Sequence, residues 1–199
     1  MRITVQAQAK INWALDILSR REDGYHEMDM LMQKIALSDE IRFETARWTT
    51  LTVNGHLIAN AGKNLIVRAA NLLNEYMGEK RGVRITLSKR IPVRAGLGGG
   101  SADCAAALMA LNDLWGFKLP AKTLKKLALS LGADVPYCME NDFCRVRGIG
   151  EDVQTLENAP KIPLVVACVS PGLSTQAVFS NFDEAGDSPL NVPMEKLCG

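Results

Sequence analysis

The sequence predicts an α+β fold, and three patterns lead to this prediction. Residues 3–17 alternate between apolar and polar side chains, which is typical of a strand with one buried face. Residues 65–77 and 121–131 carry apolar side chains at helical spacing. Between these two segments, a glycine-rich run leads directly into an alanine-rich stretch. We expect a first domain over residues 1–150 and a second, smaller one over residues 151–199.

Composition narrows the possible functions. The chain has 199 residues, of which 47% are apolar, and this is enough for a sizeable core. Its formal net charge of +1 lacks the basic excess of nucleic-acid-binding proteins. No apolar run reaches transmembrane length, and the first residues lack the apolar stretch of a signal peptide. We therefore expect neither a nucleic-acid partner nor a membrane partner.

Cysteine and histidine usage argues against a metal centre. The five cysteines form no Cys-x-x-Cys pair, and the chain has two histidines. A zinc site or a disulfide framework is therefore not expected. Reduced thiols are the ordinary state in the cytoplasm, so we expect a cytoplasmic protein.

The N-terminal strand carries two polar residues of interest. Odd positions from Ile3 to Ile17 are apolar, and almost all even positions between them are polar. Lys10 and Asn12 consequently project from the same polar face, about 7 Å apart along the strand. From this pattern alone, we expect both side chains to be solvated.

A turn and several strands follow. Asp23-Gly24 is the tight point of a turn over residues 20–24, and Tyr25-His26 comes directly after it. These two rings either contact a heterocyclic base or are ordinary structural or surface residues. Strands are predicted near residues 28–36, 40–43 and 49–53, and Asn54-Gly55 predicts a hairpin.

The helical segments have clear end signals. Asn64 is the predicted N-cap of a helix that stops at Gly78, and residues 83–87 form the next predicted strand. The helix over residues 121–131 ends at Gly132, and Val135 is expected to be extended because proline follows it. Asp134 then lies at the negative end of a helix dipole, which is unfavourable for a carboxylate. Either a functional role or a local hydrogen bond in a turn would explain this placement.

The segment from Pro92 to Ala107 is the most informative in the chain. Its glycines at positions 96, 98, 99 and 100 lack the Cβ atoms that would keep an anion away from the backbone. We expect Ser101 to cap a helix over residues 102–115, whose free N–H groups and dipole favour a phosphate. The run matches neither a Walker A loop nor the dinucleotide fingerprint. A phosphate-binding loop is the favoured interpretation, and a flexible glycine hinge is the alternative.

The C-terminal part predicts fewer elements. Residues 140–151 are predicted as a connection and a strand that leave the first domain. Residues 163–170 are mostly apolar and predict a buried strand, and residues 174–181 predict a helix.

Five segments taken together resemble the GHMP small-molecule kinases. They are Ala9-Lys-Ile-Asn12, Asp23-Gly-Tyr-His-Glu27, Pro92–Ala107, Gly132-Ala-Asp-Val-Pro136 and Gly148-Ile-Gly-Glu151. The resemblance extends from the first residues to about residue 180, and the first two segments narrow it to the branch that phosphorylates 4-diphosphocytidyl-2-C-methyl-D-erythritol. It implies a ribosomal-protein-S5-like two-layer N-terminal domain, followed by an incomplete α+β C-terminal domain.

The resemblance also implies a reaction and a site. The reaction is transfer of the ATP γ-phosphoryl group to the 2-hydroxyl of this cytidine diphosphate-linked substrate, in non-mevalonate isoprenoid biosynthesis. Lys10 and Asp134 match the catalytic pair, whereas Asn12, Tyr25 and His26 match substrate-binding residues. The implied nucleotide-binding residues are Asn64, Pro92, Val93, Arg94, Ala95, Gly96, Leu97, Gly98, Gly99, Gly100, Ser101 and Ala102.

ATP and Mg²⁺ are the implied cofactors, with Ser101 near the phosphates and the ion and no residue assigned as a metal ligand. Phosphoryl transfer needs alignment and charge neutralisation more than covalent help. We therefore expect Lys10 mainly to orient Asp134 and to steady the charge that develops in the transition state.

Three features depart from the family's pattern. Residues 140–142 (Glu-Asn-Asp) stand where the family has a glycine-threonine turn, and Cys104 stands in place of an alanine. The family's third motif, a glycine-rich loop of the C-terminal domain, has no counterpart before Gly199. We expect the strand over residues 164–169 to leave an unpaired sheet edge, and with it either self-association or a poorly ordered C-terminal third.

Two other functions stay open beside the kinase reaction. One is a truncated, non-catalytic descendant that binds a nucleotide or a partner. The other is a different GHMP kinase, acting on mevalonate-type or sugar substrates, and Tyr25-His26 argues against it.

Overall fold

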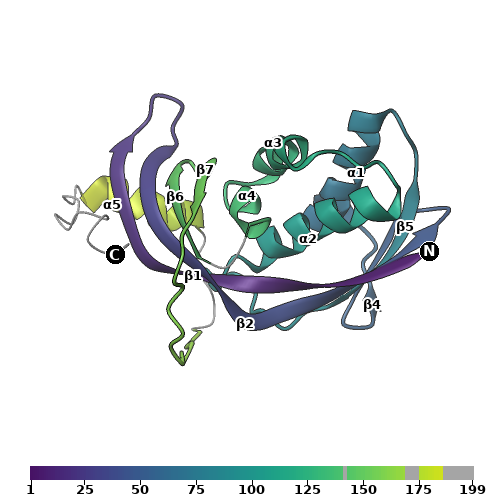
Figure 1. Ribbon diagram of the computed structural model, residues 1–199, viewed down its shortest axis with the longest axis horizontal. Helices are drawn as coiled ribbons and strands as arrows, with labels where there is room; N and C mark the ends of the chain where they lie inside the picture. Colours follow the sequence, from purple (N-terminus) through teal and green to yellow (C-terminus); the bar gives the residue numbers. More distant parts are fainter. Residues whose placement is uncertain (141–142, 169–174, 186–199) are drawn as a thin grey trace.

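A mixed seven-stranded sheet with helices packed against it forms the described part of the chain, residues 1–140, 143–168 and 175–185 of a computed structural model (Figure 1). The strands are β1 (Arg2–Arg20), β2 (His26–Ala46), β3 (Thr50–Val53), β4 (His56–Leu57), β5 (Gly82–Ser88), β6 (Phe143–Gly148) and β7 (Asp152–Thr155). The helices are the 3-10 turn η1 (Ala61–Lys63), α1 (Leu65–Met77), α2 (Gly99–Leu114), α3 (Ala121–Leu131), α4 (Val135–Cys138) and α5 (Thr175–Ala185). The predicted α+β class is confirmed.

The long strand β2 organises the sheet. It pairs antiparallel with β1 from the Arg20–His26 pair to the Arg2–Glu44 pair. On its other edge, the first half of β2 pairs with β6 and the second half with β5. The sheet then continues through β3, parallel to β5, and through β7, antiparallel to β6. The two predicted strands over residues 28–36 and 40–43 are therefore parts of one strand.

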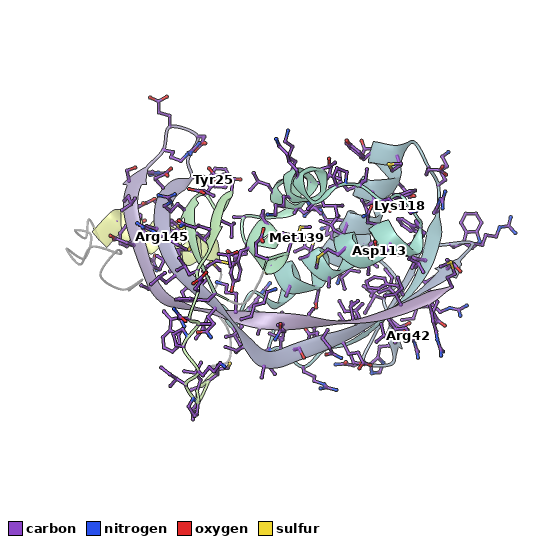
Figure 2. All side chains as sticks on the ribbon, in the orientation of Figure 1. Tyr25, Arg42, Asp113, Lys118, Met139 and Arg145 are labelled. Carbon is purple, nitrogen blue, oxygen red and sulfur yellow. The ribbon has the colours of Figure 1, made fainter. Side chains whose placement is uncertain are left out.

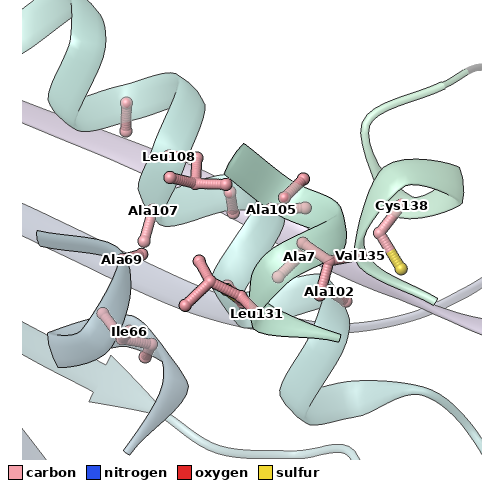
Figure 3. Packing of buried hydrophobic residues seen from close by; sticks show 14 of the residues in the cluster. Ala7, Ile66, Ala69, Ala102, Ala105, Ala107, Leu108, Leu131, Val135 and Cys138 are labelled. Carbon is pink, nitrogen blue, oxygen red and sulfur yellow. The ribbon is translucent and has the colours of Figure 1, made fainter. Parts of the chain in front are cut away.

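The core lies between the sheet and helices α1, α2 and α3. Strand β5 follows strict alternation, with Val83, Ile85 and Leu87 buried, and so confirms the strand predicted there. Helix α2 is buried over most of its surface, and its alanines allow close packing against β1 and β2. Figure 3 shows part of this cluster, which joins α2 to Ala69 of α1 and to Leu131 of α3.

Helix ends follow the predicted signals in α1 and α3 but not in α2. The Asn64 side chain accepts a hydrogen bond from the Ile66 N–H at 2.9 Å, and Gly78 ends α1 with a left-handed φ of 66°. Ser101 as the cap of α2 is wrong. The helix already begins at Gly99, with Gly98 at the N-cap position, because the positive φ of Gly98 turns the chain earlier.

Two further predictions are wrong. Val135 is the first residue of α4 and is helical rather than extended. The described residues of the predicted strand 163–170, which are 163–168, have no regular structure, and Val165 is 99% exposed. An apolar run becomes a buried strand only where a sheet edge accepts it, and this segment joins no strand of the described sheet.

Of the other predictions for the C-terminal part, one is confirmed and the others stay predictions. Helix α5 confirms the helix predicted near residues 174–181. The domain boundary near residue 150 and self-association stay predictions, and the last fourteen residues, 186–199, lie outside the described part. None of the helices that the structure describes is long and apolar enough to cross a membrane.

We predict that Asn64→Ala lowers the free energy of unfolding by about 1 kcal/mol, because the Ile66 N–H loses its side-chain acceptor at the start of α1. Urea denaturation would measure the difference. Asn64→Asp keeps an acceptor in the same position and should behave like the wild type. Equal stability of the alanine variant would show that the cap does not contribute.

Candidate active site

Lys10 lies where the pairing of β1 with β2 is irregular. The register shifts between Gln8 and Lys10 and again between Asn12 and Ala14. The Lys10 N–H donates to the carbonyl of Leu97 at 2.9 Å, so the glycine-rich loop is bonded directly to this strand. Lys10 is 7% exposed, and the expectation of a solvated side chain is therefore wrong. Alternation alone could not show it, because the loop covers the polar face of the strand here.

The ammonium of Lys10 meets two polar groups. Its Nζ lies 3.4 Å from Oδ2 of Asp134 and donates to Oδ1 of Asn12 at 3.2 Å. Asn12 is partly buried, and its amide N–H group points to the sulfur of Met30 at 3.9 Å. Strand β1 and the segment after α3 thus bring together the predicted catalytic pair.

Asp134 was predicted to face only the negative end of the α3 dipole, but in the structure it also faces the ammonium of Lys10. It follows the end of α3 but also occupies the N-cap position of α4, and its side chain forms no capping bond there. Its carboxylate is turned to Lys10 instead. The ammonium therefore provides the charge that compensates Asp134, and the penalty expected from the α3 dipole is not decisive.

The glycine-rich loop has the backbone geometry of an anion-binding concavity. Arg94, Gly96 and Gly98 have positive φ angles of 59°, 74° and 66°, and the residues between them do not. Alternation between left- and right-handed residues turns successive N–H groups toward one side. The free N–H groups of the first turn of α2 follow immediately. This arrangement can hold a phosphate group.

The loop also lies close to Lys10, the predicted catalytic lysine, and to the start of α1. A Cβ atom on Gly98 would lie 2.8 Å from Cγ of Lys10, so only glycine fits here. A Cβ on Gly100 would touch Leu65, which places Asn64 close to the first turn of α2. The predicted nucleotide-binding residues and Lys10 thus form one group.

Tyr25 and His26 lie at the curved end of the sheet, where Figure 2 shows Tyr25 far from Asp113 and Lys118. Tyr25 is exposed and His26 is buried. Helix α5 covers the imidazole, because Nε2 of His26 lies 2.7 Å from Oδ1 of Asp183. The ring of Phe179 stacks on it with centroids 4.8 Å apart. Sequence reasoning missed both α5 residues, since no local pattern marks them.

Sequence reasoning also missed a cluster of two buried carboxylates and one partly buried ammonium behind the phosphate loop. Lys89 forms ion pairs with Asp39 and Asp103. Burial raises the pKa of Asp103 to about 7, against an ordinary value of 3.8. Asp103 interrupts an otherwise apolar alanine-rich helix, and this is the one sequence signal that could have revealed the cluster.

The chain is similar to known kinases in sequence. The family model described as the GHMP kinases N terminal domain matches residues 64–141. Two 4-diphosphocytidyl-2-C-methyl-D-erythritol kinases, from Caldanaerobacter subterraneus subsp. tengcongensis and Rhizobium etli, are 40% and 42% identical over 96% of the chain. The chain spans 66% of the length of each of these relatives.

Solved structures show the same relationship. A crystal structure of 4-(cytidine 5'-diphospho)-2C-methyl-D-erythritol kinase superposes with a TM-score of 0.67 and 34% identity, over 94% of this chain and 74% of that one. The mevalonate kinase of Methanococcus jannaschii superposes with a TM-score of 0.56 at 15% identity, over 79% of this chain and 56% of that one. At this identity the second match shows a shared fold.

We predict that Gly98→Ala destabilises the protein more than Gly96→Ala does. Both glycines have positive φ angles, so each substitution carries a backbone cost of roughly 1 kcal/mol. A Cβ on Gly96 meets no atom within 4 Å, whereas one on Gly98 meets Lys10 at 2.8 Å. Urea denaturation of both variants would measure the difference, and equal losses would contradict the close contact with Lys10.

We predict that ionisation of Asp103 weakens the fold as the pH rises. Because the folded-state pKa is raised to about 7, the folded state binds more protons than the unfolded state between about pH 4 and 7. The unfolding free energy should fall by roughly 2–3 kcal/mol from pH 5 to 7 through this group. Asp103→Asn should remove this fall, whereas Asp113→Asn, at an exposed site of the same helix, should keep it. Denaturation at several pH values tests this, and parallel profiles for the wild type and Asp103→Asn would refute it.

Proposed function

Because this chain belongs to the 4-diphosphocytidyl-2-C-methyl-D-erythritol kinase family of GHMP kinases, we propose that it transfers the γ-phosphoryl group of ATP to the 2-hydroxyl of that substrate. The observation that carries the proposal is the pair of Lys10 and Asp134, 3.4 Å apart and beside the phosphate loop. A nucleophile-activating carboxylate, a cation and a phosphate cradle are the groups that transfer to an alcohol requires.

Asp134 acts on the attacking hydroxyl. Its carboxylate is one-third exposed, so a substrate hydroxyl can reach it as well as Lys10. Asp134 accepts the proton of that hydroxyl and orients the oxygen in line with the γ-phosphorus. General-base help of this kind contributes roughly 10²–10⁴-fold to the rate.

Lys10 has two roles: it orients Asp134, and it supplies positive charge beside the phosphate loop. Its buried ammonium holds the carboxylate of Asp134 from one side, and Asn12 holds the ammonium from the other. The same positive charge lies beside the loop that binds the phosphates and counters the negative charge of the transferred group.

Mg²⁺ fits the residues around the loop as an ion bound together with ATP. Among the described residues, no group of three or more histidine, cysteine, aspartate or glutamate side chains could hold a metal ion. Mg²⁺ takes many of its ligands from phosphate oxygens and water, so a single protein oxygen such as the Ser101 hydroxyl is sufficient. When bound, the ion would neutralise charge on the β- and γ-phosphates.

The curved end of the sheet fits the cytidine part of the substrate. Tyr25 presents an exposed ring, and His26 and Phe179 form a stacked pair beside it. Asn12 faces Met32 in the β1–β2 ladder, and Met32 lies six positions after His26 on β2, a path of about 20 Å. Figure 1 shows that the two strands curl along this path, so the direct separation is shorter. An elongated substrate with a base at one end and the reacting hydroxyl at the other matches this arrangement.

The proposed reaction belongs to non-mevalonate isoprenoid biosynthesis, and we place it in the cytoplasm. Cys104, Cys138 and Cys144 are buried and form no disulfide, as expected of a protein kept in a reducing compartment.

We predict Mg-ATP-dependent ADP release with 4-diphosphocytidyl-2-C-methyl-D-erythritol, and a fall in kcat of roughly 10²–10⁴-fold in Asp134→Asn. Lys10→Met should lose activity as well, because Asp134 then lacks its orienting partner. Lys118→Met removes a charge at the end of the molecule opposite to Tyr25 (Figure 2) and should keep wild-type turnover. A coupled ADP assay measures all four proteins.

Three results would oppose the proposal. Near-normal turnover of Asp134→Asn would remove the proposed base. Mg-ATP binding without any turnover by the folded wild type would favour a non-catalytic nucleotide-binding protein. Faster turnover with mevalonate than with the cytidine-linked substrate would indicate a different GHMP kinase.

A further inference from the structure

Two buried carboxylates and one partly buried ammonium lie behind the phosphate loop and take no part in the proposed reaction. Asp39 on β2 is completely buried, and Asp103 on α2 is 4% exposed. The ammonium of Lys89, which follows β5, pairs with Oδ2 of Asp39 and lies 3.2 Å from Oδ2 of Asp103. Burial of charges is costly even when they are paired, so this cluster needs an explanation beyond stability.

The contacts of the cluster fix both ends of the loop. Oδ1 of Asp39 accepts hydrogen bonds from the backbone N–H groups of Arg90 and Ile91, the latter at 2.9 Å. Ile91 directly precedes Pro92, where the loop begins. Asp103 lies in the second turn of α2, directly after the end of the loop. Lys89 bonds to both aspartates and therefore links the entrance of the loop to its exit.

Lys89 also lies against the first residue of α2. A Cβ atom on Gly99 would lie 2.9 Å from Nζ of Lys89 and 2.9 Å from Cγ2 of Ile91. Gly99 does not have a left-handed φ, so the lack of space rather than the backbone conformation requires glycine here. An ammonium at the positive end of a helix dipole is unfavourable by itself, and the two carboxylates compensate for it.

We propose that Lys89 is a positioning residue of the phosphate loop. By linking Asp39 to Asp103, it holds the N–H groups of residues 98–102 in the arrangement that receives the phosphates of ATP. This inference rests on the proposed function, because ATP is the ligand assigned to the loop. In this role the side chain of Lys89 acts through the backbone of the loop, because the two carboxylates hold its ammonium.

A purely electrostatic role for Lys89, neutralising the aspartates, can be separated from a positioning role. At pH 8, the pH chosen for the test, Asp103 is ionised because its pKa is about 7, and two carboxylates and one ammonium give the wild type a formal charge of −1. In the double variant Lys89→Met/Asp103→Asn, Asp39 alone gives the same −1 and keeps its two backbone donors. The double variant therefore removes the link between loop entrance and α2 at constant charge.

The test measures Mg-ATP binding by calorimetry and steady-state kinetics. We expect the double variant to bind Mg-ATP roughly tenfold to a hundredfold more weakly than the wild type. The KM for ATP should rise while the KM for the erythritol substrate stays unchanged. Amides of residues 94–102 should exchange hydrogen faster in the absence of nucleotide, which a neutralising role would not cause.

The matched control is another buried ion pair. Arg145 on β6 and Asp29 on β2 form a bidentate contact at 2.9 and 2.6 Å away from the loop. Arg145→Met/Asp29→Asn should lower the melting temperature but leave the affinity for Mg-ATP unchanged. If Lys89→Met/Asp103→Asn fails to fold, Asp103→Ala alone removes the acceptor of one of the two links and should weaken ATP binding in the same direction.

The outcomes separate this inference from the proposed function. Wild-type affinity and wild-type amide exchange in the double variant would overturn the positioning role and leave the kinase proposal intact. An equal loss of ATP affinity in the control pair would attribute the effect to general destabilisation and also overturn it. A folded wild type that binds no Mg-ATP would overturn the proposed function, and the inference with it.

Discussion

The hydrogen bond from the Lys10 N–H to the Leu97 carbonyl is the interaction on which the site depends. It fastens the phosphate loop to β1 at the point where the register with β2 shifts. The loop can approach so closely because Gly98 has no side chain. As a result, the Lys10 side chain is enclosed beside the loop and directed to Asp134. One irregularity in a strand thus sets the relation between the phosphate cradle and the catalytic pair.

The charged groups around the phosphate loop are arranged so that positive groups face the proposed phosphates and the carboxylates behind the loop are compensated. The N–H groups of the loop and the ammonium of Lys10 are positive toward the proposed phosphates, and the carboxylate of Asp134 is placed on the side of the acceptor hydroxyl. Behind the loop, Asp39 and Asp103 would oppose an anionic ligand if they were uncompensated. Lys89 lies between them, so the backbone donors keep their favourable field. A glycine loop alone would be too flexible for this task, and buried ion pairs supply the rigidity.

Local signals predicted the parts of the fold that depend on local chemistry. The Asn64 cap, the Gly78 stop and the alternation in β5 each act over a few residues and lie where expected. Predictions failed where contacts between segments far apart in the sequence determine the local structure. The burial of Lys10 depends on a loop almost ninety positions later in the chain. The described part, residues 163–168, of the strand predicted at residues 163–170 lacks a sheet edge to join. The stacking of Phe179 on His26 and the pairing of Lys89 with Asp103 are likewise tertiary contacts that no periodicity encodes.

The proposed catalytic residues and the proposed base-binding residues lie on the same pair of long strands, β1 and β2. Lys10 and Asn12 project from the middle of β1, whereas His26 begins β2 next to the turn that joins the two strands. The proposed substrate would contact residues at both ends of the β1–β2 ladder, so one continuous pair of strands, rather than two separate domains, would set the distance between its binding groups. Displacement of the register by one residue would move Lys10 away from Asp134 and turn its side chain to the other face. The register of this ladder consequently sets the distance between the proposed catalytic pair and the proposed base-binding residues.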